Sequence, residues 1–329
     1  GSYVRGVFMS FYEVIKEKRD VDVLGLASSR TKEDVYRVLA KEVLQEDDLI
    51  TLLSPAASGC LEAMAKRAQV EHLKHFGKAV VLYTPMYISN HCVNKCSYCG
   101  FNIDNKIKRK KLTLDEIEVE ARLIAKTGLK HILLLTGESP IATPIEYLKD
   151  SVQVLKRHFQ SIALEIYPLE EAEYQTLIAS GVDGLAVYQE TYNEKIYDDV
   201  HLAGPKKDYL FRLNTPERGC QAGMRSVGIG ALLGLDNWRR EVFYTGLHGK
   251  YLIEKYPGVE YSFSFPRIKP HVGMDQSYDG KDRTNDGIDD RVFVQIITAL
   301  KIFLPYFGTN ISTRECGDFR KNLLPIGVS

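Results

Sequence analysis

The sequence predicts an α/β protein built as a (β/α)8 barrel of the TIM type, complete or partly open, with a helical extension before it. From Ala79 onward, short β-branched or aliphatic runs alternate about eight times with amphipathic segments of helix length. Strands and helices that alternate in this way form parallel sheets joined by crossover helices. The length of 329 residues suits one barrel with an added segment.

The helical extension is expected over residues 1–76, and the barrel over residues 77–329. Residues 11–18 are rich in charged helix formers, and the Thr-Lys-Glu-Asp sequence that begins at Thr31 is typical of a helix N-terminus. Apolar residues follow at helical spacing, and no run of strand type occurs in this part. We therefore expect these helices to wrap against the barrel.

Eight strands and seven helices are expected after the extension. The strands are 80–87, 131–136, 162–167, 184–188, 227–232, 260–265, 309–313 and 325–328. The helices are 113–127, 143–158, 170–180, 192–199, 215–223, 237–254 and 288–303. A capping box that begins at Thr113 fixes the start of the first of these helices. In such a barrel the chemistry lies at the carboxyl ends of the strands.

The charge balance argues against two classes of partner. Lysine plus arginine and aspartate plus glutamate both number 43, so the formal net charge is zero. No overall field attracts nucleic acid or an anionic membrane, and we expect neither as a partner. The apolar runs are strand-sized, far below the roughly 20 residues of a membrane-spanning helix. Without a signal-peptide pattern, we expect a cytoplasmic protein.

Three of the six cysteines fall within eight residues. Cys92, Cys96 and Cys99 form a Cys-x3-Cys-x2-Cys pattern directly after the first expected strand. Cysteine thiolates are the usual ligands of iron–sulfur clusters, and a [4Fe–4S] cluster ordinarily takes four of them. Three ligands leave one iron open, as an incomplete protein shell does at catalytic zinc. The spacing therefore favours a [4Fe–4S] cluster that binds another molecule.

Two alternatives to the open cluster remain. A distant cysteine, Cys60, Cys220 or Cys316, can supply a fourth ligand, or the three cysteines can bind zinc in a scaffold without catalytic activity. Zinc motifs usually carry a second ligand pair, such as C-x2-C or H-x3-5-H, and this sequence offers none. The open cluster remains the favoured interpretation.

The cysteine motif resembles that of the radical S-adenosylmethionine (SAM) superfamily. The resemblance implies that the amino and carboxylate groups of SAM bind the open iron, and that one electron then splits the cofactor to a 5′-deoxyadenosyl radical. Tyr98, inside the motif, is expected to contact SAM. The resemblance assigns further residues to the cofactor: Gly137, Glu138, Gln189, Glu190, Arg212, Gly228 and Gly230.

The resemblance gives several of these residues a particular contact. Thr136-Gly-Glu138 resembles the Gly-Gly-Glu element of the family, whose backbone faces the ammonium group of the cofactor. Glu190 is expected to accept hydrogen bonds from the ribose or the amino group of SAM, or else to complement a helix dipole. Gly228 and Gly230 are expected to let the backbone approach adenine closely, and Arg212 to contact the ribose or carboxylate of SAM.

Segments spread over most of the chain resemble one subgroup, the aromatic amino-acid lyases. They are residues 52–59, 87–92, 99–101, 107–110, 133–138, 187–192, 264–267 and 312–315. The match looks closest to the tyrosine lyases of thiamine biosynthesis, which are of the 2-iminoacetate synthase type. The resemblance then implies cleavage of the Cα–Cβ bond of L-tyrosine to 2-iminoacetate (dehydroglycine) and p-cresol. An [FeFe]-hydrogenase maturase and a tryptophan lyase are the alternatives.

A zwitterionic substrate in a dry barrel needs a partner for its carboxylate, and arginine offers a bidentate fork. Arg267 and Arg314 are the candidates, because each follows an expected strand beside a serine, Ser264 or Ser312. Either arginine can instead form a structural ion pair. The substrate phenol also needs a hydrogen-bonding partner, but the sequence does not single one out.

Two protein partners are implied by this chemistry. A flavodoxin or ferredoxin is expected to supply the electron, and a thiazole synthase to receive the imine product. The basic run at residues 107–111 follows the cysteine motif directly. It forms either a solvated surface or the docking surface for the acidic electron donor.

Overall fold

The computed structural model describes residues 10–269, 288–312 and 314–329, so the first nine residues of the expected extension and Thr313 of the expected seventh strand lie outside the described residues. In the described part, six helices precede the first strand: α1 (Phe11–Glu17), α2 (Val23–Ser28), α3 (Lys32–Leu39), α4 (Glu46–Leu52), α5 (Pro55–Ser58) and α6 (Leu61–Phe76). Thr31 caps α3 with a capping box, as its sequence predicts. This confirms the helical character of the segment before the barrel.

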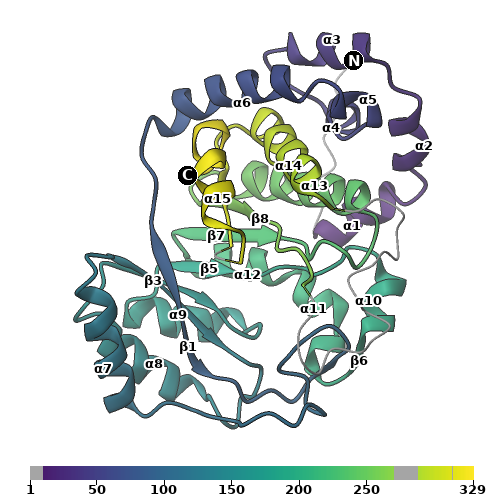
Figure 1. Ribbon diagram of the computed structural model, residues 1–329. Helices are drawn as coiled ribbons and strands as arrows, with labels where there is room; N and C mark the ends of the chain where they lie inside the picture. The colour runs from purple at the N-terminus through teal and green to yellow at the C-terminus, as the bar shows by residue number, and fades with distance from the viewer. Residues whose placement is uncertain (1–9, 270–287, 313) are drawn as a thin grey trace.

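A curled sheet of seven parallel strands forms the centre of the molecule (Figure 1). In spatial order the strands are β1 (Tyr83–Ser89), β3 (His131–Thr136), β4 (Ser161–Glu165), β5 (Gly184–Ala186), β7 (Ser226–Gly230), β8 (Glu260–Ser264) and β9 (Gly308–Asn310). Among the described residues β1 and β9 are the edges, and no pairing joins them. The predicted α/β barrel fold is confirmed in its partly open form, a half-barrel.

Helices connect the strands along the outside of the sheet. They are α7 (Leu114–Ala125), α8 (Ile145–Leu155), α9 (Glu171–Ser180), α10 (Glu194–Val200), α11 (Tyr209–Leu213), α12 (Thr215–Ala222), α13 (Trp238–Lys255) and α14 (Asp290–Phe303). Seven of them match the expected helices to within a few residues, and α11 was not predicted. Thr113 caps α7 in a complete capping box with Glu116, as predicted.

Both ends of the barrel differ from the prediction. The expected strand at 325–328 is wrong, because Leu324–Ile326 forms a short 3-10 helix, η3, after α15 (Gly317–Leu323). Gly327 then adopts a positive φ of 144°, which a strand residue does not use. At the other end β1 begins at Tyr83 rather than at residue 80, because its partner β3 begins at His131, the residue opposite Tyr83.

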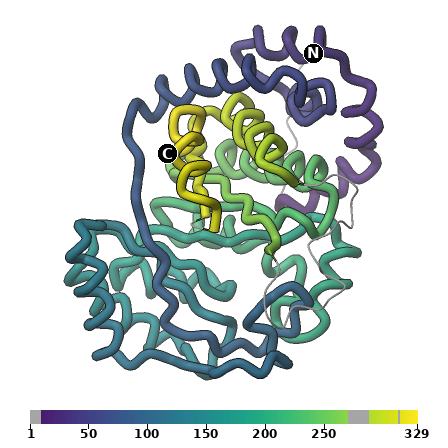
Figure 2. Tube along the Cα trace, viewed as in Figure 1, coloured from purple at the N-terminus to yellow at the C-terminus, as the bar shows by residue number. Residues whose placement is uncertain are grey.

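The N-terminal helices cover the second half of the barrel. Helix α6 packs along α14, and α4 contacts both α13 and α14. The connection from α6 then runs down the side of the molecule to β1 (Figure 2). In the part of the chain that the structure describes, no helix is both long and apolar enough to cross a membrane.

Candidate active site at the cysteine loop

The cysteine loop runs from Asn90 to Cys99, across the carboxyl end of the sheet. Within it a short strand, β2 (Lys95–Cys96), pairs with β6 (His201–Ala203) in a small antiparallel ribbon. The backbone N–H of Cys99 donates to the carbonyl of Cys96 at 3.2 Å, which turns the chain between these two ligands. All three cysteines are free, with Cys96 buried and the other two partly exposed. The loop therefore presents three thiols at the end of the sheet where the chemistry is expected.

Arg109 ties the two ends of this loop together. Its Nη1 donates to the carbonyl oxygens of Asn90 at 2.7 Å and Phe101 at 2.9 Å. Its Nη2 donates to those of Asn102 at 2.7 Å and Asn105 at 3.4 Å. One planar guanidinium thus bonds four carbonyls, one before the three cysteines and three after them. A lysine ammonium lacks this fork geometry.

Tyr98 is fixed by a buried histidine of β6. Burial lowers the pKa of His201 to about 3, so the ring is neutral. Its Nδ1 lies 2.7 Å from the carbonyl oxygen of Tyr197, which can only accept, so Nδ1 carries the proton. Nε2 is then an acceptor, and the Tyr98 hydroxyl donates to it at 2.8 Å. This bond holds Tyr98, which lies between Cys96 and Cys99 in the sequence, in one position.

Gly137 allows β3 to pass directly under the loop. A Cβ atom at this position would lie 2.3 Å from the carbonyl oxygen of His91, so no larger residue fits without displacing the chain next to Cys92. The following residue, Glu138, accepts a hydrogen bond from the side-chain amide of Asn94 at 2.6 Å. Its carbonyl also accepts from Val93 N–H at 2.8 Å. The Thr-Gly-Glu element therefore supports the cysteine loop in this structure.

Glu190 has a strained backbone and a buried carboxylate. Among the described non-glycine residues it is the one with a positive φ, at 70°. Its carboxylate accepts from Lys206 Nζ at 2.8 Å and from Arg212 Nη2 at 3.2 Å. Burial opposes the charge, but these two cations hold the pKa of Glu190 below its usual range. Glu190, Lys206 and Arg212 thus form a charged cluster near the cysteines.

The residues present fit a [4Fe–4S] cluster and its cofactor. Burial raises the pKa of Cys96 to about 12, whereas the Lys206 ammonium acts in the opposite direction on Cys96 and Cys99 and so favours their thiolates. Beside Glu190, the buried amide nitrogen of Gln189 has no hydrogen-bonding partner among the described residues, which leaves a donor for a ligand.

The spacing of the side chains bears on the kind of metal centre. Within the described ranges, no three His, Cys, Asp or Glu side chains lie close enough together to share a single metal ion. In a [4Fe–4S] cluster each thiolate binds a different iron, so the three sulfur atoms lie farther apart than ligands of a single ion do.

Two cavities meet at Lys206. The larger, of about 590 Å³, begins at Tyr98 and Cys99 and continues through the interior of the half-barrel, between the edge strands β1 and β9. The smaller, of about 370 Å³, includes Glu138 and Arg212 in its wall. Lys206 lines both. Lys206 therefore stands between the two cavities, and its partner Glu190 lines the larger one.

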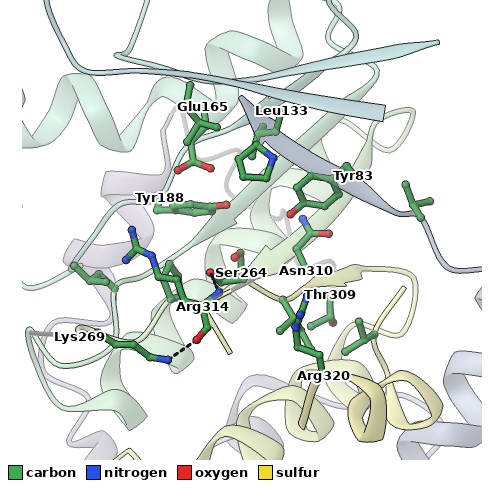
Figure 3. A pocket seen from close by; sticks show the side chains of 18 of the residues that line it. Tyr83, Leu133, Glu165, Tyr188, Ser264, Lys269, Thr309, Asn310, Arg314 and Arg320 are labelled. Carbon is green, nitrogen blue, oxygen red and sulfur yellow. Dashed lines mark hydrogen bonds between the residues drawn. The ribbon is translucent and has the colours of Figure 1, made fainter. Parts of the chain in front are cut away.

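The predicted substrate residues divide between the cavity and the protein interior. Ser264, Ser312 and Arg314 line the larger cavity, and Figure 3 shows Arg314 beside Ser264. Arg267 is absent from the lining. Its Nε donates to Glu315 at 2.9 Å, its Nη2 bonds the other oxygen of the same carboxylate, and its Nη1 lies 3.0 Å from Asp290. The guanidinium thus forms the structural ion pair that was the alternative for Arg267, and its contact with the substrate stays a prediction.

Gly228 and Gly230 lie in β7, outside the lining of both cavities. A Cβ at Gly230 would overlap the carbonyl oxygen of Ser264, and one at Gly228 would lie 3.1 Å from Ser262 Oγ. In this structure the two glycines let β7 and β8 pack closely. Their expected contact with adenine stays a prediction.

Glu165, Lys206 and Arg109 were missed by the sequence analysis. Glu165 is the last residue of β4 and lines the larger cavity. Its signal in the sequence was a single carboxylate in an otherwise apolar strand, at the end where barrels carry their chemistry. Arg109 belongs to the basic run, and Lys206 lies in a short 3-10 helix, η1 (Pro205–Lys207), without a recognisable sequence motif.

Comparison with known proteins agrees with this geometry. The model of the Radical SAM superfamily matches residues 86–244, and that of the Biotin and Thiamin Synthesis associated domain matches residues 264–329. The 2-iminoacetate synthase of Escherichia coli (strain K12) is 41% identical over 303 residues, which cover 92% of this chain and 78% of the relative. The 2-iminoacetate synthase of Salmonella typhimurium (strain LT2) is 40% identical, with the same coverage of both chains.

A solved structure extends the likeness to the fold. The crystal structure of HydG, a maturase of the [FeFe]-hydrogenase, superposes with a TM-score of 0.87 at 28% identity, over 96% of this chain and 70% of that one. The cysteine loop, the half-barrel and the sequence identity lead to one conclusion. The chain belongs to the radical SAM superfamily and, within it, to the family of the 2-iminoacetate synthases.

Proposed function

We propose that this protein is a radical SAM carbon–carbon lyase that cleaves the Cα–Cβ bond of L-tyrosine to 2-iminoacetate and p-cresol, for the thiazole of thiamine. One observation carries the proposal. The cavity that begins at Cys99 and Tyr98 also holds Arg314, Ser264 and Ser312, with several tyrosine rings in its wall. Such a space suits an aromatic amino acid placed next to an iron–sulfur cluster.

The cofactor site is proposed around the cysteine loop. Cys92, Cys96 and Cys99 would hold the [4Fe–4S] cluster, and SAM would bind beside them, where Tyr98 and Glu190 line the larger cavity and Glu138 and Arg212 the smaller one. When bound, these two groups supply the 5′-deoxyadenosyl radical. The proposed SAM contacts are Tyr98, Gly137, Glu138, Gln189, Glu190, Arg212, Gly228 and Gly230.

Arg314 is proposed to bind the substrate carboxylate, with Ser264 and Ser312 as additional donors. Its guanidinium lies close to the Tyr87 hydroxyl and acts against the rise in the pKa of Tyr87 that burial causes. A bidentate pair between Arg314 and the carboxylate would fix the Cα atom and turn the amino group toward the cysteine end of the cavity. The apolar walls, such as Leu133 and Leu135, would keep water away from reactive intermediates.

The electron donor is proposed to be a flavodoxin or ferredoxin that docks over residues 106–108. Lys106 and Lys108 are exposed next to the cysteine loop. By contrast, Lys110 pairs with Glu116 at 3.0 Å, and Lys111 lies over the ring of Tyr147. Two unengaged lysines near the cluster suit a small acidic protein. We further propose a thiazole synthase as recipient of the imine, and the cytoplasm as location, where free cysteines persist.

The test is anaerobic reconstitution with iron and sulfide, followed by reduction in the presence of SAM and either tyrosine or tryptophan. We expect p-cresol and glyoxylate, the latter from hydrolysis of the imine. Cyanide and carbon monoxide would instead indicate a maturase, and an indole acid a tryptophan lyase. A colourless protein with one bound zinc would support the scaffold alternative.

A further inference from the structure

Glu165 is a partly exposed carboxyl group in the wall of the larger cavity. It ends β4, and Figure 3 shows its carboxylate directed into the cavity beside the ring of Tyr188. Its carboxylate makes no hydrogen bond with any residue that the structure describes, so its oxygens face the cavity without a protein partner. An acceptor without a protein partner in the wall of a cavity points to a ligand with a donor.

The groups that face Glu165 come from several elements. Tyr83 of β1 and Tyr188, which follows β5, are close enough for Glu165 to raise their pKa values, although burial is the larger cause for both. Burial raises the pKa of Glu165 to about 7, and Glu190 adds to the rise, whereas Arg212, Arg314 and Lys206 lower it. The carboxyl group is therefore poised between its two protonation states near neutral pH.

The depth of Glu165 in the half-barrel decides which part of tyrosine it can reach. The strand registers place it level with Ser262 of β8, two residues before Ser264. Arg314 follows the end of β9, whose last residue, Asn310, pairs with Ser264. Counted along the strands, Ser264 and Asn310 thus come two residues beyond Glu165 toward the carboxyl ends, and the chain leads on from Asn310 to Arg314.

Tyrosine carries its carboxylate and amino groups on one carbon and its hydroxyl at the far end of the ring. If Arg314 holds the carboxylate and the amino group faces the cysteine end, the ring points into the half-barrel. We infer that Glu165 accepts the hydrogen bond of the phenol hydroxyl and so selects tyrosine over phenylalanine. The inference rests on the proposed function, which supplies tyrosine as the substrate.

Two measurable consequences follow for binding. A hydrogen bond to a charged acceptor in a site built for it contributes about 10- to 100-fold in affinity. Since the ionised carboxylate is the better acceptor, the affinity for tyrosine should rise with pH through about 7, the pKa of Glu165. Phenylalanine lacks the hydroxyl, so its binding should show much less of this dependence.

The experiment measures dissociation constants of tyrosine and phenylalanine for the reconstituted protein with SAM but without a reductant, so that no turnover occurs. Glu165→Gln should weaken tyrosine binding about 10- to 100-fold, leave phenylalanine binding within about twofold, and flatten the pH profile. The matched control is Glu120→Gln, the same change at an exposed position of α7, which should alter neither ligand. Iron content and melting temperature verify that each variant is folded.

Other outcomes overturn the inference. If Glu165→Gln lowered the affinity for both ligands equally, Glu165 would contact the amino group of the substrate or stabilise the fold. If tyrosine binding did not change, Glu165 would not bind the phenol hydroxyl. The wild-type pH profiles test the same point without a variant, since parallel profiles for the two ligands contradict it. If the wild type forms no p-cresol from tyrosine, the proposed function itself fails, which product analysis detects independently of Glu165.

Discussion

Replacing Arg109 tests whether the cysteine loop depends on one guanidinium. Three of its four hydrogen bonds to carbonyl oxygens are 2.9 Å or shorter, and they join Asn90 on one side of the cysteines to Phe101 and Asn102 on the other. Arg109→Ala removes them all. Arg109→Lys keeps the charge, but a single ammonium can reach only one side of the loop.

The magnitude follows from those three bonds. A hydrogen bond contributes about 0.5–1.5 kcal/mol, and more when one group is charged; because Arg109 is charged but only half-buried, we take about 1–1.3 kcal/mol for each of the three. We expect Arg109→Ala to cost about 3–4 kcal/mol in the ordered loop, and Arg109→Lys about half of that. Because the cluster binds only to the ordered loop, its apparent affinity should fall by the same free energy, about 100- to 1,000-fold for alanine.

The assay is iron and sulfide retained per chain when the reconstituted protein is titrated with a chelator. The chelator concentration at half-loss should fall steeply for Arg109→Ala and less for Arg109→Lys. Lys108→Ala, in the same basic run but exposed, is the matched control and should behave as wild type. If Arg109→Ala retained its cluster as well as Lys108→Ala, the carbonyl contacts would not hold the loop and our reasoning would be refuted.

Four further predictions concern separate parts of the molecule. Cys96→Ala should form no 5′-deoxyadenosine from SAM, and normal formation, followed by chromatography, would contradict a cluster on the three cysteines. Arg314→Lys should raise the KM for tyrosine about tenfold or more, because it removes the bidentate fork. Arg267→Lys should mainly lower the melting temperature, because it weakens the ion pair with Glu315. The reverse pattern would mean that Arg267, not Arg314, binds the substrate. The double variant Lys106→Glu, Lys108→Glu should be reduced more slowly by a flavodoxin at low salt but at the wild-type rate by dithionite. If flavodoxin reduced the variant and the wild type at equal rates, these lysines would not be the docking surface. Burial lowers the pKa of Lys301 to about 7 in the folded protein, against about 10 in the unfolded chain. Between these two pH values the unfolded chain binds one more proton, so the free energy of unfolding should rise with pH. Urea unfolding of the apoprotein should show this rise for the wild type and a flatter dependence on pH for Lys301→Met.

Much of the fold could be predicted because its signals are local. Alternation of apolar runs located the strands and helices, and the capping boxes at Thr31 and Thr113 marked helix starts that the structure reproduces. The errors arose where strand pairing, rather than local sequence, decides whether a segment forms a strand. Residues 80–82 have strand-like side chains but no strand opposite them, and residues 325–328 turn at Gly327 instead of adding a strand at the open edge.

The candidate site was predictable only in part, for a related reason. The cysteines share one loop, so their spacing alone indicated the cluster. Arg267 and Arg314 look equivalent in the sequence. In the structure Arg267 pairs with Glu315, which is 48 residues away along the chain, whereas Arg314 lines the cavity. Arg109 acts on backbone carbonyls, which have no signature in a sequence. The role of Glu165 depends on which face of β4 turns inward, and that is known only once the sheet is curled.

The strained loop at Glu190 shows how distant segments complete the site. Its carboxylate is held by Lys206 and Arg212 on one side of the strained residue. On the other side, Tyr192 N–H donates to the buried Glu241 at 3.0 Å, and the Tyr192 hydroxyl is hydrogen-bonded to His248 Nδ1 at 2.9 Å.

The ring of Phe11, in the first N-terminal helix, stacks on His248 at 4.1 Å between centroids. A positive φ at a glutamate costs about 1–3 kcal/mol, and it persists only where the surroundings fix it. Because part of that restraint passes through Phe11, the N-terminal helices help to hold the conformation of the proposed cofactor-binding loop.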